Sequence, residues 1–232
     1  MGETKMAGLA NIKIVIFDLD GTVIFPHAVK SSINYYGLAL GIEKEWEETI
    51  TRFHRSELNG VLPQEHTTLF QVLSALLKDK PVAPVIEILD NLPYTKGFGT
   101  FCSYLQQEGI RTALVSHSDY IVGKKVQAKY SIDCVVTNEY HTYQGRFTGE
   151  GTIRVPFGKK GDVVKRVYTL FGADYDSCCY IGDSANDVDP WKAVSVPLGM
   201  NIGKQHVPYV LQHFTDFFQV KTYFEDVLER CS

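Results

Sequence analysis

Two aspartates at the end of an apolar run are the residues of this chain best placed to do chemistry. Residues 12–17 are rich in β-branched side chains and form a run short enough for a buried parallel strand, which Asp18, Asp20 and Gly21 follow directly. In an open α/β sheet, ligands bind outside the carboxyl ends of the strands, and a glycine there permits a sharp turn. Because neighbouring carboxylates are costly unless a cation or a proton stabilises them, the stretch indicates a metal-assisted phosphoryl-transfer site. An acidic Asp-Gly turn without chemistry is the alternative.

Three further polar clusters follow a predicted strand or begin a predicted helix. Ser116 and His117 end one apolar run, Lys160 lies in a Gly-Lys-Lys-Gly-Asp stretch that opens a helix, and Asp183 and Asp187 follow another apolar run. Taken singly, each cluster has a structural interpretation without chemistry: a helix cap for the first, an exposed lysine pair for the second and a capping loop for the third. However, helix N-termini favour anions, a lysine offsets carboxylate charge, and paired acids supply the oxygen ligands that Mg²⁺ requires. Four such clusters in equivalent places indicate one shared site.

The elements that must position these clusters alternate between strand and helix. Such repeated units predict an α/β fold, with a Rossmann-like parallel sheet and helices on both faces. Apolar runs predict strands over 12–17, 112–115, 134–137, 178–181 and 195–200, and helical spacing predicts helices over 98–108, 120–129, 162–171 and 187–194. A polar, hairpin-like stretch follows residue 137, and terminal helices are predicted over 209–213 and 222–230.

A helical insertion follows the first strand. Between residues 26 and 93, apolar residues recur at helical spacing in four segments separated by Gly, Pro or Asn, and no strand-like run interrupts them. The predicted organisation is therefore a catalytic core formed by residues 1–25 and 94–232, with a small all-helical cap over 26–93.

Composition narrows the class of protein. The chain has 232 residues, 44% of them hydrophobic, and a formal net charge of −4, and it contains no long Lys/Arg run, which argues against a nucleic-acid partner. No apolar stretch approaches a membrane span, and the N-terminus lacks a signal-peptide core. The five cysteines are an odd number without metal-type spacing, which favours reduced thiols and a cytoplasmic location. The sequence does not define the oligomeric state.

The ordered set of motifs resembles the haloacid dehalogenase superfamily of phosphohydrolases over nearly the whole chain. The first motif is Asp18-x-Asp20-Gly21-Thr22, the second Ser116, the third Lys160, and the fourth Gly182-Asp183-x-x-Asn186-Asp187. More narrowly, the chain is similar to the phosphoserine-phosphatase branch, which carries a helical cap between the first and second motifs. The stretch from Asn138 through Gly145-Arg146-Phe147-Thr148-Gly149 to Lys160-Gly161 is similar to that branch as well.

The resemblance implies a Mg²⁺-dependent phosphatase that acts through an aspartyl-phosphate. Asp18 would be the nucleophile, and Asp20 would protonate the leaving oxygen and then activate water. The resemblance further implies three sets of residues: Mg²⁺ at Asp18, Asp20, Asp183 and Asp187; phosphate at Gly21, Thr22, Ser116, His117 and Lys160; and support from Asn186. A phosphotransferase or phosphomutase on the same scaffold is the first alternative, and a non-catalytic regulatory protein is the second.

The cap departs from the phosphoserine-phosphatase pattern. Those enzymes hold the substrate's amino and carboxylate groups with a cap Glu and a cap Arg, and the corresponding positions here are His27 and approximately Gln71. Because neither residue reproduces the charge, phosphoserine is not the expected main substrate. We expect a small phosphorylated metabolite instead, with His27, Arg55 and His117 as candidate contacts to it.

Overall fold

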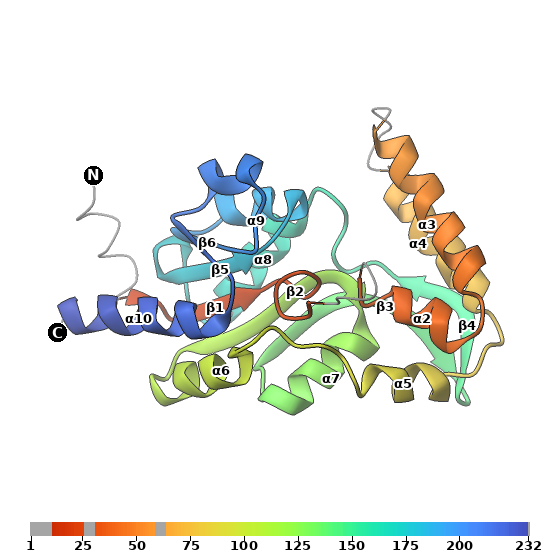
Figure 1. Ribbon diagram of the computed structural model, residues 1–232, viewed down its shortest axis with the longest axis horizontal. Helices are drawn as coiled ribbons and strands as arrows, with labels where there is room; N and C mark the ends of the chain where they lie inside the picture. The colour runs from red at the N-terminus through yellow and green to blue at the C-terminus, as the bar shows by residue number, and fades with distance from the viewer. Residues whose placement is uncertain (1–10, 26–30, 59–63, 232) are drawn as a thin grey trace.

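The computed structural model describes residues 11–25, 31–58 and 64–231, with the side chains of 54–58, 64–68 and 228–231 left undescribed. Its centre is a seven-stranded sheet within this described part, in the order β4-β3-β2-β1-β5-β6-β7 (Figure 1). All neighbouring strands are parallel except the β3–β4 pair. The strands are β1 (Ile14–Phe17), β2 (Arg111–Asp119), β3 (Cys134–Tyr143), β4 (Arg146–Thr152), β5 (Cys178–Gly182), β6 (Val196–Met200) and β7 (Gln212–Phe214).

The register of the three central strands decides where the polar motifs meet. Phe17, the last residue of β1, lies opposite Leu114 on β2 and Ile181 on β5. Because these strands are parallel, the residues that follow them in the sequence emerge at the same edge of the sheet. The first, second and fourth motifs are thereby brought together.

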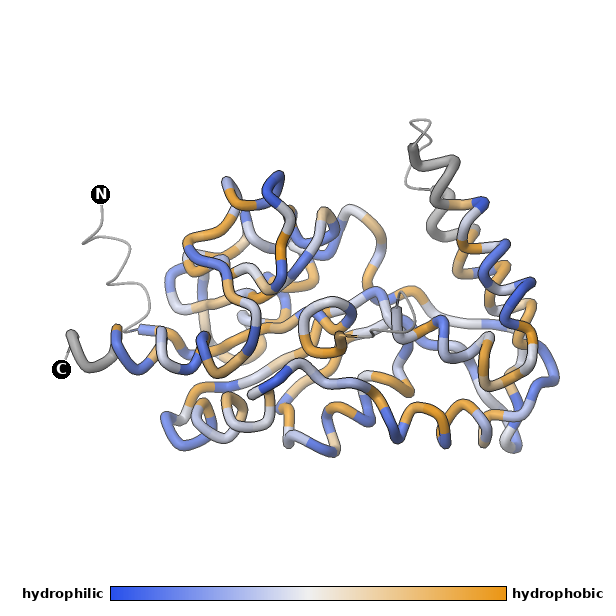
Figure 2. The backbone as a smooth tube through the Cα atoms, in the orientation of Figure 1, coloured by the Kyte–Doolittle hydropathy of each residue, from blue (hydrophilic) through white to orange (hydrophobic). Residues whose placement is uncertain are grey.

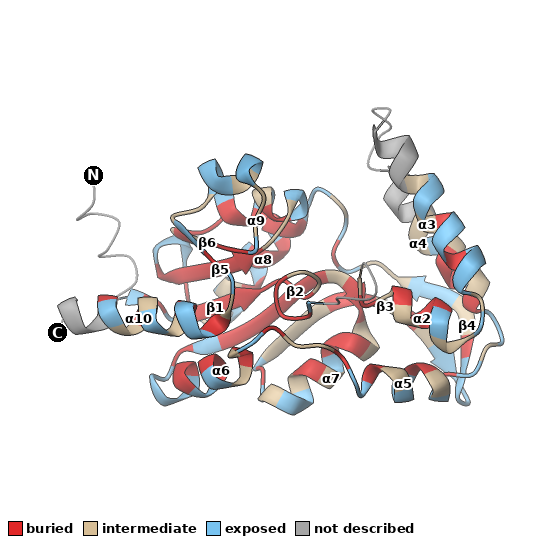
Figure 3. Ribbon diagram, in the orientation of Figure 1, coloured by how far each residue is buried: buried red, intermediate tan, exposed pale blue. Residues whose placement is uncertain are grey.

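Helices cover both faces of the sheet, and the alternation of β1 supplies a core to each face. Val15 and Phe17 pack into one hydrophobic core, while Ile14 and Ile16 pack into the other, so β1 is buried on both sides (Figure 3). The first core is covered by α6 (Phe98–Gln107), α7 (Tyr120–Tyr130) and α10 (Phe217–Cys231), and the second by α8 (Lys160–Leu170) and α9 (Val188–Lys192). The predicted α/β, Rossmann-like class is confirmed.

The described part of the segment between β1 and α6 contains four helices. Its helices are α2 (Asn34–Ala39), α3 (Glu43–Leu58), α4 (Gln64–Leu77) and α5 (Ala83–Leu89). Figure 1 shows α3 and α4 side by side, projecting away from the sheet, and Figure 2 shows hydrophobic and hydrophilic residues following one another along them. Trp46 is fully buried and stacks on Tyr36 with 6.2 Å between ring centroids, which fastens α3 to α2. The division into a core and a cap at residues 26 and 93 stays a prediction.

Two segments have a structure that their apolar pattern did not define or predicted wrongly. The polar stretch after residue 137 is a long β-hairpin, whose turn residues Gln144 and Gly145 both have positive φ (48° and 75°), as tight hairpins require. The helix predicted over 209–213 is wrong. A 3-10 helix, η4 (Lys204–Tyr209), contains Pro208, and β7 then adds a parallel strand to β6. Among the described helices, none is long and apolar enough to cross a membrane.

Candidate active site

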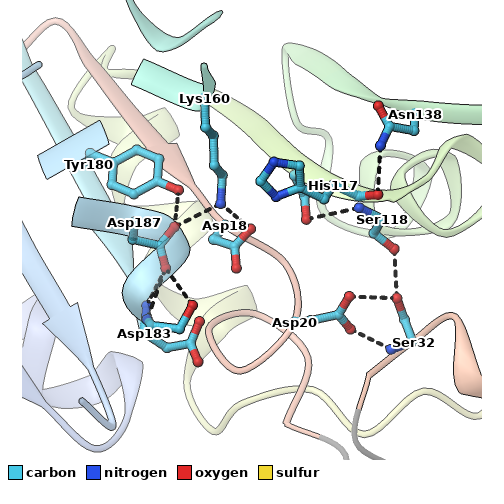
Figure 4. A network of polar contacts seen from close by, with 12 residues as sticks. Asp18, Asp20, Ser32, His117, Ser118, Asn138, Lys160, Tyr180, Asp183 and Asp187 are labelled. Atoms are coloured by element: carbon cyan, nitrogen blue, oxygen red, sulfur yellow. Dashed lines mark hydrogen bonds and ion pairs between the residues drawn. The ribbon is translucent and has the colours of Figure 1, made fainter. Parts of the chain in front are cut away.

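A buried lysine joins two carboxylates at the centre of the site. Lys160, at the start of α8, donates to Asp18 Oδ1 and to Asp187 Oδ1, both at 2.7 Å (Figure 4). The Lys160 side chain is 2% exposed, and those of its two partners are 9% and 0% exposed. Burial alone would lower the pKa of Lys160, but the two carboxylates outweigh it and raise that pKa well above its usual range. The ammonium is therefore permanently charged and lies beside Asp18.

Asp187 is saturated by protein donors. Its Oδ1 accepts from Lys160 and, at 2.6 Å, from the Tyr180 hydroxyl. Its Oδ2 accepts from the backbone N–H groups of Asp183 and Ser184, at 2.8 and 3.0 Å. Burial by itself raises the pKa of Asp187, but Lys160 and these hydrogen bonds hold that pKa below its usual range. This carboxylate fixes both the lysine and the loop that carries Asp183.

The Asp183 carboxylate has one oxygen without a hydrogen-bond donor among the described residues. Within the described part of the chain, its Oδ1 is buried and has no hydrogen-bond partner. Burial, followed by the charges of Asp18 and Asp187, raises the pKa of Asp183 to about 9. Carboxylate oxygens of these three aspartates lie within 4.8 Å of one another. Oxygen ligands converging around an orphaned acceptor fit a hard divalent cation such as Mg²⁺.

Gly21 makes room for this arrangement. Its φ is +85°, and a Cβ added there would lie 2.2 Å from Asp183 Oδ2. A side chain at this position would therefore be strained and would also displace the Asp183 carboxylate. The glycine of the first motif and the aspartate of the fourth are packed directly against each other.

Asp20 is held from the segment that leads into α2. The Ser32 N–H donates to Asp20 Oδ1 at 2.5 Å, and the Ser32 hydroxyl donates to Oδ2 at 3.0 Å (Figure 4). The hydroxyls of Ser32 and Ser118 lie 2.6 Å apart, which links this contact to β2. Burial raises the pKa of Asp20 to about 6, and the neighbouring Asp18 carboxylate adds to the effect. A carboxyl with that pKa can donate and accept a proton near neutral pH.

One cavity of about 370 Å³ joins these groups. Its wall includes residues from all four motif regions and from α2, α3, α4 and the β3–β4 hairpin. The residues of the predicted site that line it are Asp18, Asp20, Ser116, His117, Lys160, Asp183 and Asn186.

A profile of haloacid dehalogenase-like hydrolases matches residues 15–189 of the sequence. The chain belongs to this family. The phosphoserine phosphatase of Methanocaldococcus jannaschii is 23% identical over 188 residues, which are 80% of this chain and 84% of that enzyme. The phosphoserine phosphatase of Wolinella succinogenes is 24% identical over 177 residues, or 76% and 81% of the two chains. The family match and these phosphatase relatives make the chain a phosphoric monoester hydrolase of the phosphoserine-phosphatase-like branch.

Solved structures agree on the fold of this haloacid dehalogenase-like hydrolase. A phospho-aspartyl intermediate analogue of phosphoserine phosphatase superposes with a TM-score of 0.75 and 21% identity, covering 92% of this chain and 99% of that one. A substrate-bound phosphoserine phosphatase gives a TM-score of 0.75 and 20% identity, covering 91% and 98%. These matches place the sheet and its helices in the known arrangement of the branch.

Two predicted phosphate-binding groups of this hydrolase do not reach the cavity. The Gly21 N–H donates to the Ile24 carbonyl oxygen at 2.8 Å, because the chain turns tightly there. Thr22 is fully buried and is not part of the cavity wall. His27 lies outside the described residues, and the side chain of Arg55 is likewise outside them.

Sequence reasoning also missed a residue that the structure places in the site. Ser32 stands in a segment without a motif, and only its contact with Asp20 reveals it. Ser118 directly follows the predicted residues Ser116 and His117, yet its hydroxyl contact with Ser32 depends on the folded path of both segments.

Proposed function

We propose that this chain is a Mg²⁺-dependent phosphatase that hydrolyses a small phosphomonoester through an aspartyl-phosphate on Asp18. The observation that carries the proposal is the joint placement of Asp18, Asp20, Lys160 and Asp183 around one cavity. It supplies a nucleophile, an acid–base group, a fixed positive charge and an unsatisfied oxygen ligand at the same point.

Two displacements at phosphorus would complete the reaction. In the first, an Asp18 carboxylate oxygen forms the new bond to phosphorus, the bond to the leaving oxygen breaks, and Asp20 gives that oxygen its proton. In the second, water attacks phosphorus while Asp20 takes its proton, and Asp18 is released as phosphate forms. The pKa of Asp20, near 6, suits it to both proton transfers.

The remaining residues would bind and orient the phosphoryl group. Lys160 would pair with the phosphate oxygens and keep Asp18 in place, and Ser116 would donate to the phosphate from the end of β2. Asp18, Asp183 and the Asp20 backbone carbonyl would hold Mg²⁺, which would offset the negative charge of nucleophile and phosphate. Asp187, whose oxygens are already engaged, would position Lys160 and the Asp183 loop.

The proposed partner is a small phosphorylated metabolite, and the proposed location is the cytoplasm. The cavity is of metabolite size, at the lower end of the roughly 300–1,000 Å³ typical of ligand pockets. Free thiols at Cys102, Cys134, Cys178 and Cys179 support a reducing compartment.

Phosphate release from a panel of phosphomonoesters, with and without Mg²⁺, tests the proposal. We expect release that requires Mg²⁺ and that falls on the order of a thousandfold or more in Asp18→Asn, which removes the nucleophile. Asp176→Asn changes an exposed aspartate outside the cavity and should match the wild type. Mg²⁺ binding without release from any ester would contradict the proposal and favour a phosphotransferase that needs a second substrate.

A further inference from the structure

The cavity wall outside the catalytic residues is largely apolar. Four side chains from α3 and α4 and one from the segment before α2 contribute to it, and further apolar residues come from the chain after β4. The first five residues are Ile33, Ile50, Leu69, Phe70 and Leu73. The apolar part of this wall therefore joins the helical segment between β1 and α6 to the chain after β4, which is far away in the sequence.

The charged groups on the described cavity wall are those of the proposed reaction. They are Asp18, Asp20, Lys160 and Asp183, and each is engaged with the phosphoryl or metal position in the proposed function. Gln71, which stands near the position of a charged cap residue in phosphoserine phosphatases, is exposed and does not line the cavity. An ammonium or carboxylate that contacts this described part of the wall would thus lose water without gaining an ion pair from it, which is strongly unfavourable.

Two polar residues of the wall, Ser31 and Asn138, are engaged with other groups of the protein. Ser31 donates to the Asn34 side chain at 2.7 Å. The Asn138 side chain donates to the His117 carbonyl oxygen and accepts from the N–H groups of Arg154 and Val155, all at 3.0 Å. These groups organise the wall, and their hydrogen bonds are already made.

Tight packing forms the apolar wall in advance of binding. Phe70 stacks on Tyr140 with ring centroids 4.8 Å apart and planes 7° apart. A Cβ added at Gly151 would lie 2.6 Å from Phe70, so the glycine lets α4 lie directly on the hairpin. The cavity therefore has a defined size and shape, to which a substrate must fit.

We propose that the cavity accepts phosphomonoesters of uncharged, predominantly apolar alcohols, such as a short alkyl chain or a single ring, with Ile50, Leu69 and Leu73 determining the preference. This specificity rests on the proposed phosphatase function and goes beyond it, since the described part of the wall offers no ion pair to the two additional charged groups of phosphoserine.

A homologous series of substrates tests the proposal directly. Phosphate release is measured with Mg²⁺ for n-alkyl phosphates from methyl to hexyl, for benzyl phosphate and for phosphoserine. Each added methylene should raise kcat/KM about fourfold until the cavity is filled, because burying one methylene is worth about 0.8 kcal/mol. Phosphoserine should be turned over less efficiently than ethyl phosphate. A flat series, or phosphoserine as the best substrate, would overturn the specificity while leaving the phosphatase intact.

Matched variants connect the preference to the wall. Ile50→Asn, on α3, and Leu69→Gln, on α4, should flatten the chain-length dependence, measured as the ratio of kcat/KM for hexyl phosphate to that for methyl phosphate. Ile86→Asn makes the same exchange as the first variant at an exposed residue of α5 outside the cavity, and it should keep the full dependence. Equal dependence in all four proteins would refute the assignment of these residues.

Binding separates this inference from the proposed function. Calorimetry with n-alkyl phosphonates in the presence of Mg²⁺ reports on the wall even if no ester is hydrolysed. Affinity that rises with chain length would support the apolar site in the absence of turnover. Affinity independent of chain length would overturn it.

Discussion

Replacing Lys160 by methionine should destabilise the protein far more than replacing a surface lysine. The Lys160 ammonium is buried and contacts two carboxylates at 2.7 Å, so Lys160→Met leaves Asp18 and Asp187 charged and without that partner. Breaking a buried ion pair by removing one member costs about 3–5 kcal/mol. In a chain of this size, 1 kcal/mol corresponds to about 2–4 °C in Tm, so we expect a fall of roughly 6–20 °C.

Thermal and urea unfolding, followed by circular dichroism, measure this effect. Lys165→Met is the matched control: Lys165 also lies on α8, is 56% exposed, and forms a surface pair with Asp162 at 3.6 Å. Such a pair contributes about 0–1 kcal/mol, so this variant should unfold near the wild type. Adding Asp187→Asn to Lys160→Met removes one of the two orphaned charges and should restore part of the loss.

Two results would contradict this role of Lys160. If Lys160→Met unfolds within about 1 kcal/mol of Lys165→Met, the buried pairs contribute no more than a surface pair. If the double variant is as unstable as the sum of the two single changes, the lysine and Asp187 do not act as one unit.

Three further predictions concern the metal site and the acid–base group. Mg²⁺ at a hundred times its Kd should raise the free energy of unfolding by about 2.7 kcal/mol, or Tm by about 5–11 °C, and Asp183→Asn should abolish most of this rise. Gly21→Ala should weaken Mg²⁺ binding measured by calorimetry, since its Cβ would lie 2.2 Å from Asp183 Oδ2, and unchanged affinity would contradict that packing. Ser32→Ala removes a hydrogen bond that lowers the pKa of Asp20, so that pKa should rise from about 6, and the alkaline limb of the kcat–pH profile should move up by about one pH unit. An unmoved limb would show that Ser32 does not act through Asp20.

The sequence predicts a helix or strand when that element has its own apolar pattern, and it does so less well when the element depends on contacts with distant residues. The runs that became β1 and β5 are buried on both faces, so their apolar character alone identified them. The edge strand β7 has three residues and depends on its pairing with β6, so a local pattern could not find it. The same limit explains the wrong helix predicted over 209–213.

Motifs in the sequence predict which distant residues come together, whereas a residue that belongs to no motif is found only through its contacts in the structure. Asp18 and Lys160 are 142 positions apart, and the motif set nevertheless brought them together correctly. The Gly21 N–H was expected to face phosphate, yet a local turn satisfies it through Ile24. Ser32 carries no pattern of its own, and its role follows from the folded distance to Asp20 alone.

The contact between Ser32 and Asp20 limits how this protein could be recombined. The acid–base group belongs to the first motif, but its hydrogen-bond donors come from Ser32, which lies inside the predicted insertion and before its first helix, α2. A chimera that received residues 26–93 from another family member would keep every motif and still lose these donors. Exchanging the insertion would therefore change the protonation of Asp20 along with the substrate preference, and a graft would succeed only if the incoming segment brought an equivalent hydroxyl.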